Sequence, residues 1–193
     1  MSNKTKEMLA KALKEVLDRK PLDKITISDL TKECGVNRQT FYYHFHDIYD
    51  LIEWIYITSA NYAIGEHRTC NSWAQGMLDM CNLMFEQKDF ILKTYHSRSQ
   101  SYLENLLHNR AYELIRNVVE EEAHGYSISE ESKSFIADFY KFSFSGIILE
   151  WVGKGMKETA EDIVEKMKCI MSGSIEAAVK SLAIYEKNGK TGG

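Results

Sequence analysis

The sequence has a single proline, Pro21, in 193 residues, although proline makes up about 5% of an average protein. Because proline breaks helix interiors and is common in loops, this scarcity predicts a mostly helical chain with short connections. No apolar run exceeds four residues, whereas a membrane-spanning helix needs about 18. The basic, amphipathic N-terminal segment also lacks the continuous apolar core of a secretory signal.

The four cysteines do not indicate a metal or redox site. Cys34, Cys70, Cys81 and Cys169 are widely spaced and form no Cys-x-x-Cys pair. This spacing removes the support for a zinc ribbon or a redox motif. We therefore expect reduced thiols in a protein located in the cytoplasm.

No group of residues predicts catalysis. His44 and His46 are two positions apart, so on a helix they point in different directions and are not expected to share a metal ion. The segment 153–158 lacks the last glycine of a dinucleotide fingerprint, and the segment 143–146 lacks the first glycine of a nucleophile elbow. We expect a protein that is not an enzyme and that uses no metal or cofactor.

Charge is unevenly distributed along the chain, although the net charge is only −4. Residues 1–46 carry nine lysines and arginines against six acidic residues, a local balance of +3, so the other 147 residues carry −7. The net charge gives no sign of a nucleic-acid binder as a whole, but a mildly basic N-terminal part followed by an acidic remainder is an asymmetry that the function has to explain.

The spacing of apolar residues predicts an all-α fold. Helices are expected over about 4–19, 26–34, 37–45, 47–67, 72–86, 88–95, 99–124, 130–153 and 159–186. The segment 25–27 has the composition of a short strand. However, Thr26 followed by Asp29 is typical of a helix N-cap with an acid at the third position, and we favour the helix. The glycine-rich C-terminal tail is expected to fray.

Residues 26–45 contain the pattern that indicates function. Two short helices are joined by a turn at Gly35, and Phe41 follows six positions later, which is the spacing of a helix-turn-helix. Asn37 is a good N-cap for the second helix. The side chains expected to face outward suit base edges: arginine bonds guanine, asparagine and glutamine bond adenine, and threonine contacts a thymine methyl. They are Asn37, Arg38, Gln39, Thr40 and Tyr43.

The segment "ITISDL…GV…TFYYHF.D…L" resembles the DNA-binding domain of TetR-type bacterial transcriptional regulators over residues 4–55. The resemblance implies that Thr26 and Thr40 contact phosphates, and that Tyr42 and His44 contact the DNA backbone. It places Asn37, Arg38, Gln39 and Tyr43 in the groove. One position departs from the family pattern: Ile48 stands where the family has a phosphate-contacting lysine. The segments "RQTFYYHFHDIYDLIEW" and "EWVGKGMKETAEDI" are also similar to a subgroup that includes activators of dihydroxyacetone kinase genes.

The remainder of the chain is larger than a DNA-binding head requires, and two of its expected helices are strongly apolar. A helix that is apolar nearly all round must be buried, either in a core or between chains. We expect a homodimer built by the helices at 130–153 and 159–186, with small residues at 172–174 permitting close approach, as a four-helix bundle with the same pair of a second copy. The interface residues expected are Ile147, Trp151, Met167, Ile170, Met171, Ser174 and Ala178. The alternative is a core within one chain.

A second set of aromatic and methionine residues could line a cavity for a small effector. These residues are Trp73, Met77, Met84, Phe85, Tyr95, Tyr102 and Phe139. A stripe of this kind also occurs in an ordinary core, and nothing in the sequence identifies an effector.

Together these features predict an all-α transcriptional regulator with three parts. Residues 1–50 form a three-helix DNA-binding domain, 51–186 a helical effector and dimerisation domain, and 187–193 a flexible tail. The resemblance implies a dimeric repressor that binds a palindromic operator and is released by an effector. An activator of the same fold that responds to a partner protein is the first alternative. A helical enzyme or adaptor that does not bind DNA is the second.

Overall fold

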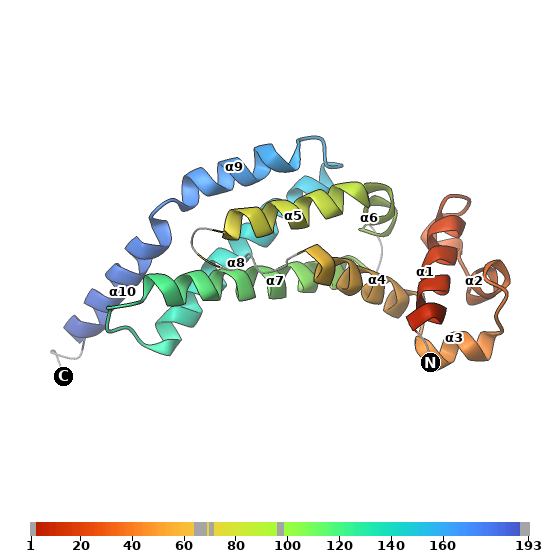
Figure 1. Cartoon of the computed structure of the whole chain (residues 1–193), viewed down its shortest axis with the longest axis horizontal. Helices are drawn as coiled ribbons and strands as arrows, with labels where there is room; N and C mark the ends of the chain where they lie inside the picture. Colours follow the sequence, from red (N-terminus) through yellow and green to blue (C-terminus); the bar gives the residue numbers. More distant parts are fainter. Residues whose placement is uncertain (1–2, 64–68, 70–71, 96–98, 190–193) are drawn as a thin grey trace.

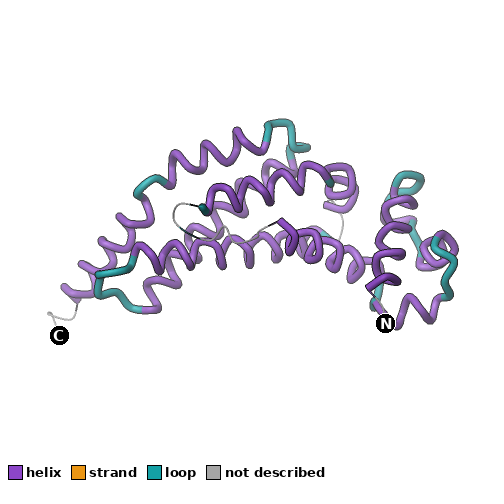
Figure 2. The backbone as a smooth tube through the Cα atoms, viewed as in Figure 1, coloured by secondary structure: helices purple, strands orange, loops and turns teal. Residues whose placement is uncertain are grey.

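The computed structural model describes residues 3–63, 69, 72–95 and 99–189, and the described segments form an elongated, helical molecule (Figures 1 and 2). The helices are α1 (Asn3–Leu17), a 3₁₀ turn (Leu22–Lys24), α2 (Ile27–Glu33), α3 (Arg38–His44), α4 (Ile48–Ala63), α5 (Trp73–Glu86), α6 (Lys88–Tyr95), α7 (Gln100–Glu122), α8 (Glu130–Gly153), α9 (Ala160–Met171) and α10 (Ser174–Gly189). No strand occurs among these residues, as the sequence predicted.

Helices α1 to α3 form a compact head at one end of the molecule (Figure 1). The apolar face of α1 is buried, as its helical spacing predicted, and it packs against α2 and α4. Leu30 from α2 and Phe41 from α3 are completely buried in the same small core. Their burial holds the two short helices, neither of which has enough residues to be stable alone.

The other helices form the body. Helices α7 and α8 pack along each other, α5 lies between α9 and α4, and α10 runs beside α7 and α8 to the end farthest from the head (Figure 1). Helix α4 begins in the head and continues into the body, so the domain boundary expected after residue 50 falls within a continuous helix. The expected extension of this helix to residue 67 lies outside the described residues.

The long helix expected over 159–186 is divided into α9 and α10. Gly173 has a φ of +71°, a left-handed conformation that ends α9 after Met171 and turns the chain into α10. The small residues at 172–174, expected to permit close approach between helices, therefore lie at the break between α9 and α10 and not within one helix. Helix α10 also continues to Gly189, beyond the start of the expected tail.

The described cysteines are free thiols in three different environments. Cys34 is half-buried, Cys81 is buried and Cys169 is exposed. Burial raises the pKa of the Cys81 thiol to about 12, which keeps it protonated at neutral pH. Cys70 lies outside the described residues.

The bend at Gly173 gives a test of the two-helix interpretation. No atom lies within 4 Å of the point that a Cβ would occupy at this position, so the φ of +71° is the main obstacle to a side chain. Gly173→Ala is expected to lower the free energy of unfolding by about 1–2 kcal/mol, because a left-handed alanine is strained. Gly173→Asn is the control and should cost less, since asparagine tolerates this conformation. Equal, negligible effects in urea denaturation would contradict the bend.

Candidate nucleic-acid interface

The start of α2 is held by a reciprocal set of hydrogen bonds. The Asp29 backbone N–H donates to Thr26 Oγ1 at 3.2 Å, while the Thr26 N–H and hydroxyl both donate to Asp29 Oδ2, at 2.9 and 2.8 Å. Lys20 Nζ lies 2.7 Å from the other carboxylate oxygen. The Lys20 hydrogen bond and the bonds from Thr26 hold the pKa of Asp29 well below its usual range. This capping box confirms the helix start that the sequence predicted.

The turn between α2 and α3 depends on one glycine. Gly35 has a φ of +68°, and the next residue, Val36, donates its backbone N–H to Thr31 O at 3.0 Å. A left-handed residue at a helix end reverses the chain direction within a few residues. As a result, α3 leaves the turn across α2 and presents its outer surface at the edge of the head.

Asn37 caps α3. Its side-chain Oδ1 accepts a hydrogen bond from the Thr40 backbone N–H at 2.7 Å and another from the Thr40 hydroxyl at 3.0 Å. The amide oxygen of Asn37 is therefore already bonded within the helix, and its amide NH₂ is the group that remains for an external contact. The Thr40 hydroxyl points its hydrogen at Asn37 in the same way.

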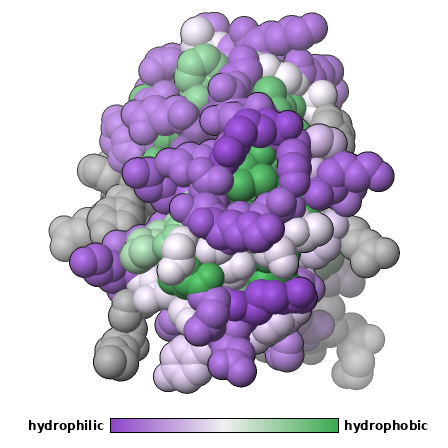
Figure 3. Space-filling view, turned by 90° about the vertical axis from the view of Figure 1, so that its right-hand side faces the viewer, coloured by the Kyte–Doolittle hydropathy of each residue, from purple (hydrophilic) through white to green (hydrophobic). Residues whose placement is uncertain are grey.

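The outer face of α3 is polar and exposed. Arg38 and Gln39 occupy its first turn, and both are exposed. Tyr42 and Tyr43 are 52% and 79% exposed, whereas the preceding residue, Phe41, is completely buried. The sequence required at least one of the two tyrosines to be exposed, and both are. Figure 3 views the molecule from the head end, where hydrophilic side chains predominate and apolar ones form only small patches.

The eight residues predicted to contact DNA all lie in the head, on α3 or at the start of α2. Their side chains are exposed or half-buried. The half-buried His44 packs edge-on against Tyr43, with ring centroids 4.9 Å apart. No three His, Cys, Asp or Glu side chains in the described segments are placed to hold a metal ion.

The seven residues predicted to line an effector cavity are divided between the core and the surface. Among them, Trp73 lines a hollow of about 340 Å³ and Phe85 another of about 420 Å³. Trp73, Met77, Met84 and Tyr95 are buried, but they are packed in the core. Phe85 and Phe139 are exposed, and Tyr102 is half-buried. Within the described core, the cavity lined by Met80 and Met84 measures about 30 Å³ and the one lined by Met77 about 10 Å³. Small-molecule sites usually measure about 300–1,000 Å³.

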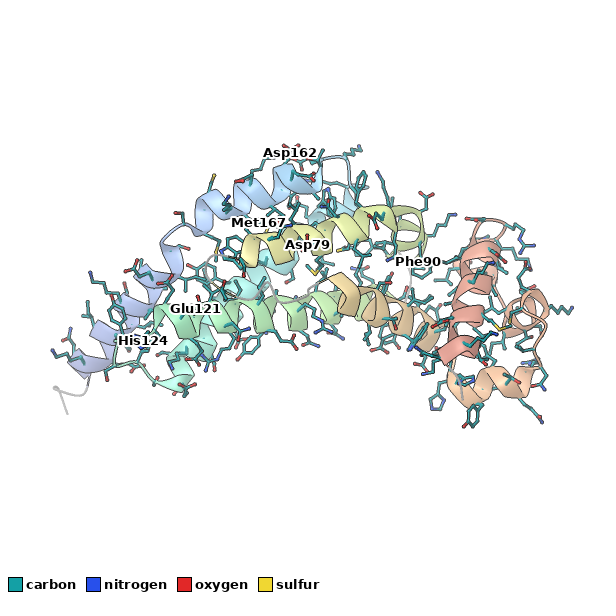
Figure 4. All side chains as sticks on the ribbon, viewed as in Figure 1. Asp79, Phe90, Glu121, His124, Asp162 and Met167 are labelled. Atoms are coloured by element: carbon teal, nitrogen blue, oxygen red, sulfur yellow. The ribbon has the colours of Figure 1, made fainter. Side chains whose placement is uncertain are left out.

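The residues predicted for a dimer interface fall into three groups. Trp151, Met167 and Met171 are buried in the protomer's own core. Figure 4 shows Met167 on the side of α9 that faces α5. Ile147 and Ile170 are exposed, and Ser174 and Ala178 are half-buried.

Sequence reasoning missed an exposed row of aromatic side chains on α8. Phe135, Phe139 and Phe142 are between 58 and 65% exposed and recur at helical spacing along one face. The sequence did show that α8 is apolar nearly all round. It did not show which face the body covers, because that depends on how α7 and α10 pack against it.

The caps give a test of the head's construction. Asn37→Ala should lower the free energy of unfolding by about 1 kcal/mol, because two donors of α3 lose their acceptor. Asn37→Asp retains the acceptor and should have little effect. Gln39→Ala, on the adjoining exposed surface, is the matched control. If Asn37→Ala unfolds at the same urea concentration as Gln39→Ala, Asn37 is not a structural cap.

Comparison with known proteins agrees with this architecture. Residues 9–55 match the family model for bacterial regulatory proteins of the tetR family, and residues 71–173 match the model described as a transcriptional regulator C-terminal region. The second match covers more than half of the chain. In the part that the structure describes, no helix is both long and apolar enough to cross a membrane.

Two similar proteins carry related names. The HTH-type dhaKLM operon transcriptional activator DhaS of Lactococcus lactis subsp. lactis (strain IL1403) is 26% identical over 157 residues, which cover 78% of this chain and 81% of that protein. A solved structure of a dihydroxyacetone kinase operon activator DhaS has the same fold, with a TM-score of 0.70 at 21% identity over 94% of this chain and 99% of that one. From the family models and the helix-turn-helix, the chain belongs to the tetR family of bacterial regulatory proteins and is a transcriptional regulator.

Proposed function

We propose that this regulator binds a palindromic operator as a homodimer, with α3 of each copy in the major groove. The observation that carries this proposal is the outer face of α3, where Arg38, Gln39 and Tyr43 are exposed on a helix held by a capped start and a glycine turn. The first turn of a recognition helix is the part that reaches base edges. Family members bind DNA, which supports the same partner here.

The two classes of contact follow from the chemistry of the side chains. Arg38 and Gln39 have planar polar ends that form paired hydrogen bonds with guanine and adenine. Tyr42 and His44 supply donors that suit phosphate oxygens, which position the head without selecting a sequence. The hydroxyls of Thr26 and Thr40 donate inside the capping networks. To donate to a phosphate they must turn away from these partners.

The dimer rests on the exposed apolar surface formed by α8 and α10, here called the α8–α10 face. It consists of Phe135, Phe139, Phe142, Ile147, Ile184 and Tyr185. Several large apolar side chains exposed on two neighbouring helices indicate an interface, unlike a single exposed leucine. The two helices pack against each other, so the same pair from a second copy completes a four-helix bundle. A two-fold symmetric pair matches a palindromic operator.

Helix α8 is fixed to α10 by a polar contact at the edge of this face. The Glu186 carboxylate accepts hydrogen bonds from the Ser129 N–H at 3.0 Å, from the Ser129 hydroxyl at 2.6 Å and from the Ser132 hydroxyl at 2.5 Å. A carboxylate is favourable at the start of a helix because it meets the positive end of the helix dipole. This contact keeps the two helices aligned for pairing.

Two modes of regulation fit this architecture. In the first, an effector changes the tilt of α4 and the separation of the heads, and the repressor leaves DNA. In the second, the body binds a partner protein and the regulator activates transcription. The small cavities in the described core favour a signal received at the surface of the body. A reporter fused to the regulated promoter distinguishes the modes, since deletion of the gene raises expression for a repressor and lowers it for an activator.

The proposed contacts predict different mutant behaviour. Arg38→Ala should cost about 1–3 kcal/mol on the operator and relax the preference at one symmetric pair of positions, because a base contact is lost. His44→Ala should weaken operator and random duplexes by similar factors, since its phosphate partner is present in every sequence. Each variant is titrated against operator, single-base variants and random DNA at fixed salt. Equal weakening of all duplexes by Arg38→Ala would make it a phosphate contact, and no weakening would contradict the placement of α3.

The α8–α10 face predicts the oligomeric state. Phe139→Glu places an unpaired carboxylate in the middle of the proposed interface, and sedimentation should then show monomers at concentrations where the unchanged protein is dimeric. Ile170→Asp is the matched control, because Ile170 is exposed on α9, which packs against α5. If Phe139→Glu leaves the protein dimeric, or if only Ile170→Asp dissociates the dimer, the interface lies elsewhere.

A further inference from the structure

Lys6, on the first turns of α1, lies at a corner where three helices meet. Its Nζ is 5.3 Å from the centre of the Phe45 ring and 5.7 Å from the centre of the Trp54 ring. Phe45 is the C-cap of α3, and Trp54 is on α4. An ammonium over two aromatic faces is attracted to both rings. Lys6 is therefore held in one place although it is only half-buried.

This corner adjoins the surface proposed to meet DNA. Figure 1 shows that α1 begins at the same end of the head at which α3 lies. The His44 and Phe45 ring centroids are 6.4 Å apart, and the Phe45 ring is the one that holds Lys6. The Phe45 ring thus lies between the Lys6 ammonium and His44, and the ammonium is next to the C-terminal end of α3.

The charge of Lys6 is available to a partner outside the chain. In the described segments Lys6 forms no ion pair with a carboxylate, and its ring contacts leave donors on Nζ unused. Two acids at the start of α4 form local hydrogen bonds: Asp47 Oδ1 accepts from the Asp50 N–H at 2.9 Å, and Asp50 Oδ2 accepts from the His46 N–H at 2.8 Å. These hydrogen bonds lie at the start of α4. Ile48, at the same end of α4, is neutral, so this helix end offers no cation to a phosphate.

We propose that Lys6 is a phosphate-contacting residue that extends the DNA-binding surface from α3 onto α1. The Phe45 and Trp54 rings fix its position, so little conformational entropy is lost when a phosphate oxygen accepts its N–H. Because the contact is to the backbone, Lys6 contributes to binding on every sequence and to selection on none. This inference rests on the proposed binding of operator DNA.

The test is the salt dependence of DNA binding by the full-length protein. Each phosphate contact contributes about 0.9 to the slope of log K against log salt concentration. Lys6→Gln removes one contact per head, so the slope for a dimer should fall by about 2, equally on operator and random duplexes. Affinity at low salt should fall by about one order of magnitude or more. Lys6→Arg keeps the charge and the ring contacts and should retain the slope.

Lys11→Gln is the matched control, with the same charge change on the same helix. Lys11 is exposed and lies 3.7 Å from Glu15, in an i,i+4 pair. The control should keep the slope of the unchanged protein. An unchanged slope for Lys6→Gln, or an equal loss for Lys11→Gln, would overturn the proposal. Thermal melting tests for a purely structural role of Lys6. If Lys6→Gln weakens DNA binding only because it lowers the melting temperature, the slope stays unchanged. This result also overturns the proposal. If the unchanged protein binds no duplex, the proposed function fails instead.

Discussion

The presentation of α3 depends on the burial of Phe41. This ring is completely covered within the head, and α3 is only seven residues long, so its position is set by packing and caps and not by its own helical stability. Burying Phe41 turns Gln39 and Tyr43 outward, since each is two positions away and lies on the opposite side of the helix. Arg38, at the first position of α3, is also exposed. The left-handed Gly35 and the Asn37 cap then determine where α3 starts. A core of a few side chains thus fixes the whole surface that faces DNA.

The head connects to the body through polar and aromatic contacts on α6. Lys93 Nζ lies 2.6 Å from Asp18, which follows α1. Lys14 Nζ lies 5.3 Å from the centre of the Phe90 ring, and Figure 4 shows Phe90 on the part of the body nearest the head. A buried hydrogen bond between Tyr56 and Thr94 ties α4 to the same helix. Helix α6 is therefore in contact both with the head, through α1 and Asp18, and with α4, which joins the head to the body.

The head could be predicted almost completely from the sequence, whereas the body could not. Thr26, Asp29, Gly35 and Asn37 act on neighbours within four residues, so their effects are visible in the local pattern. The faces of α8 are decided by helices distant in sequence, so its apolar character could not separate Trp151, which is buried, from Phe139, which is exposed. Likewise, the aromatic and methionine stripe could not show which of its side chains are buried, such as Met77, and which are exposed, such as Phe85, because that depends on the packed structure. The bend at Gly173 was missed because glycine also occurs where helices pack closely.

The central claim is that two heads of one dimer place α3 in successive major grooves on the same side of the DNA. Hydroxyl-radical footprinting of the regulated promoter with the full-length protein tests this claim most directly. The expected result is two protected segments related by two-fold symmetry, with centres about 34–36 Å apart, one helical turn, or a multiple of this distance. A single protected segment, or two segments without a symmetric relation, would contradict the claim.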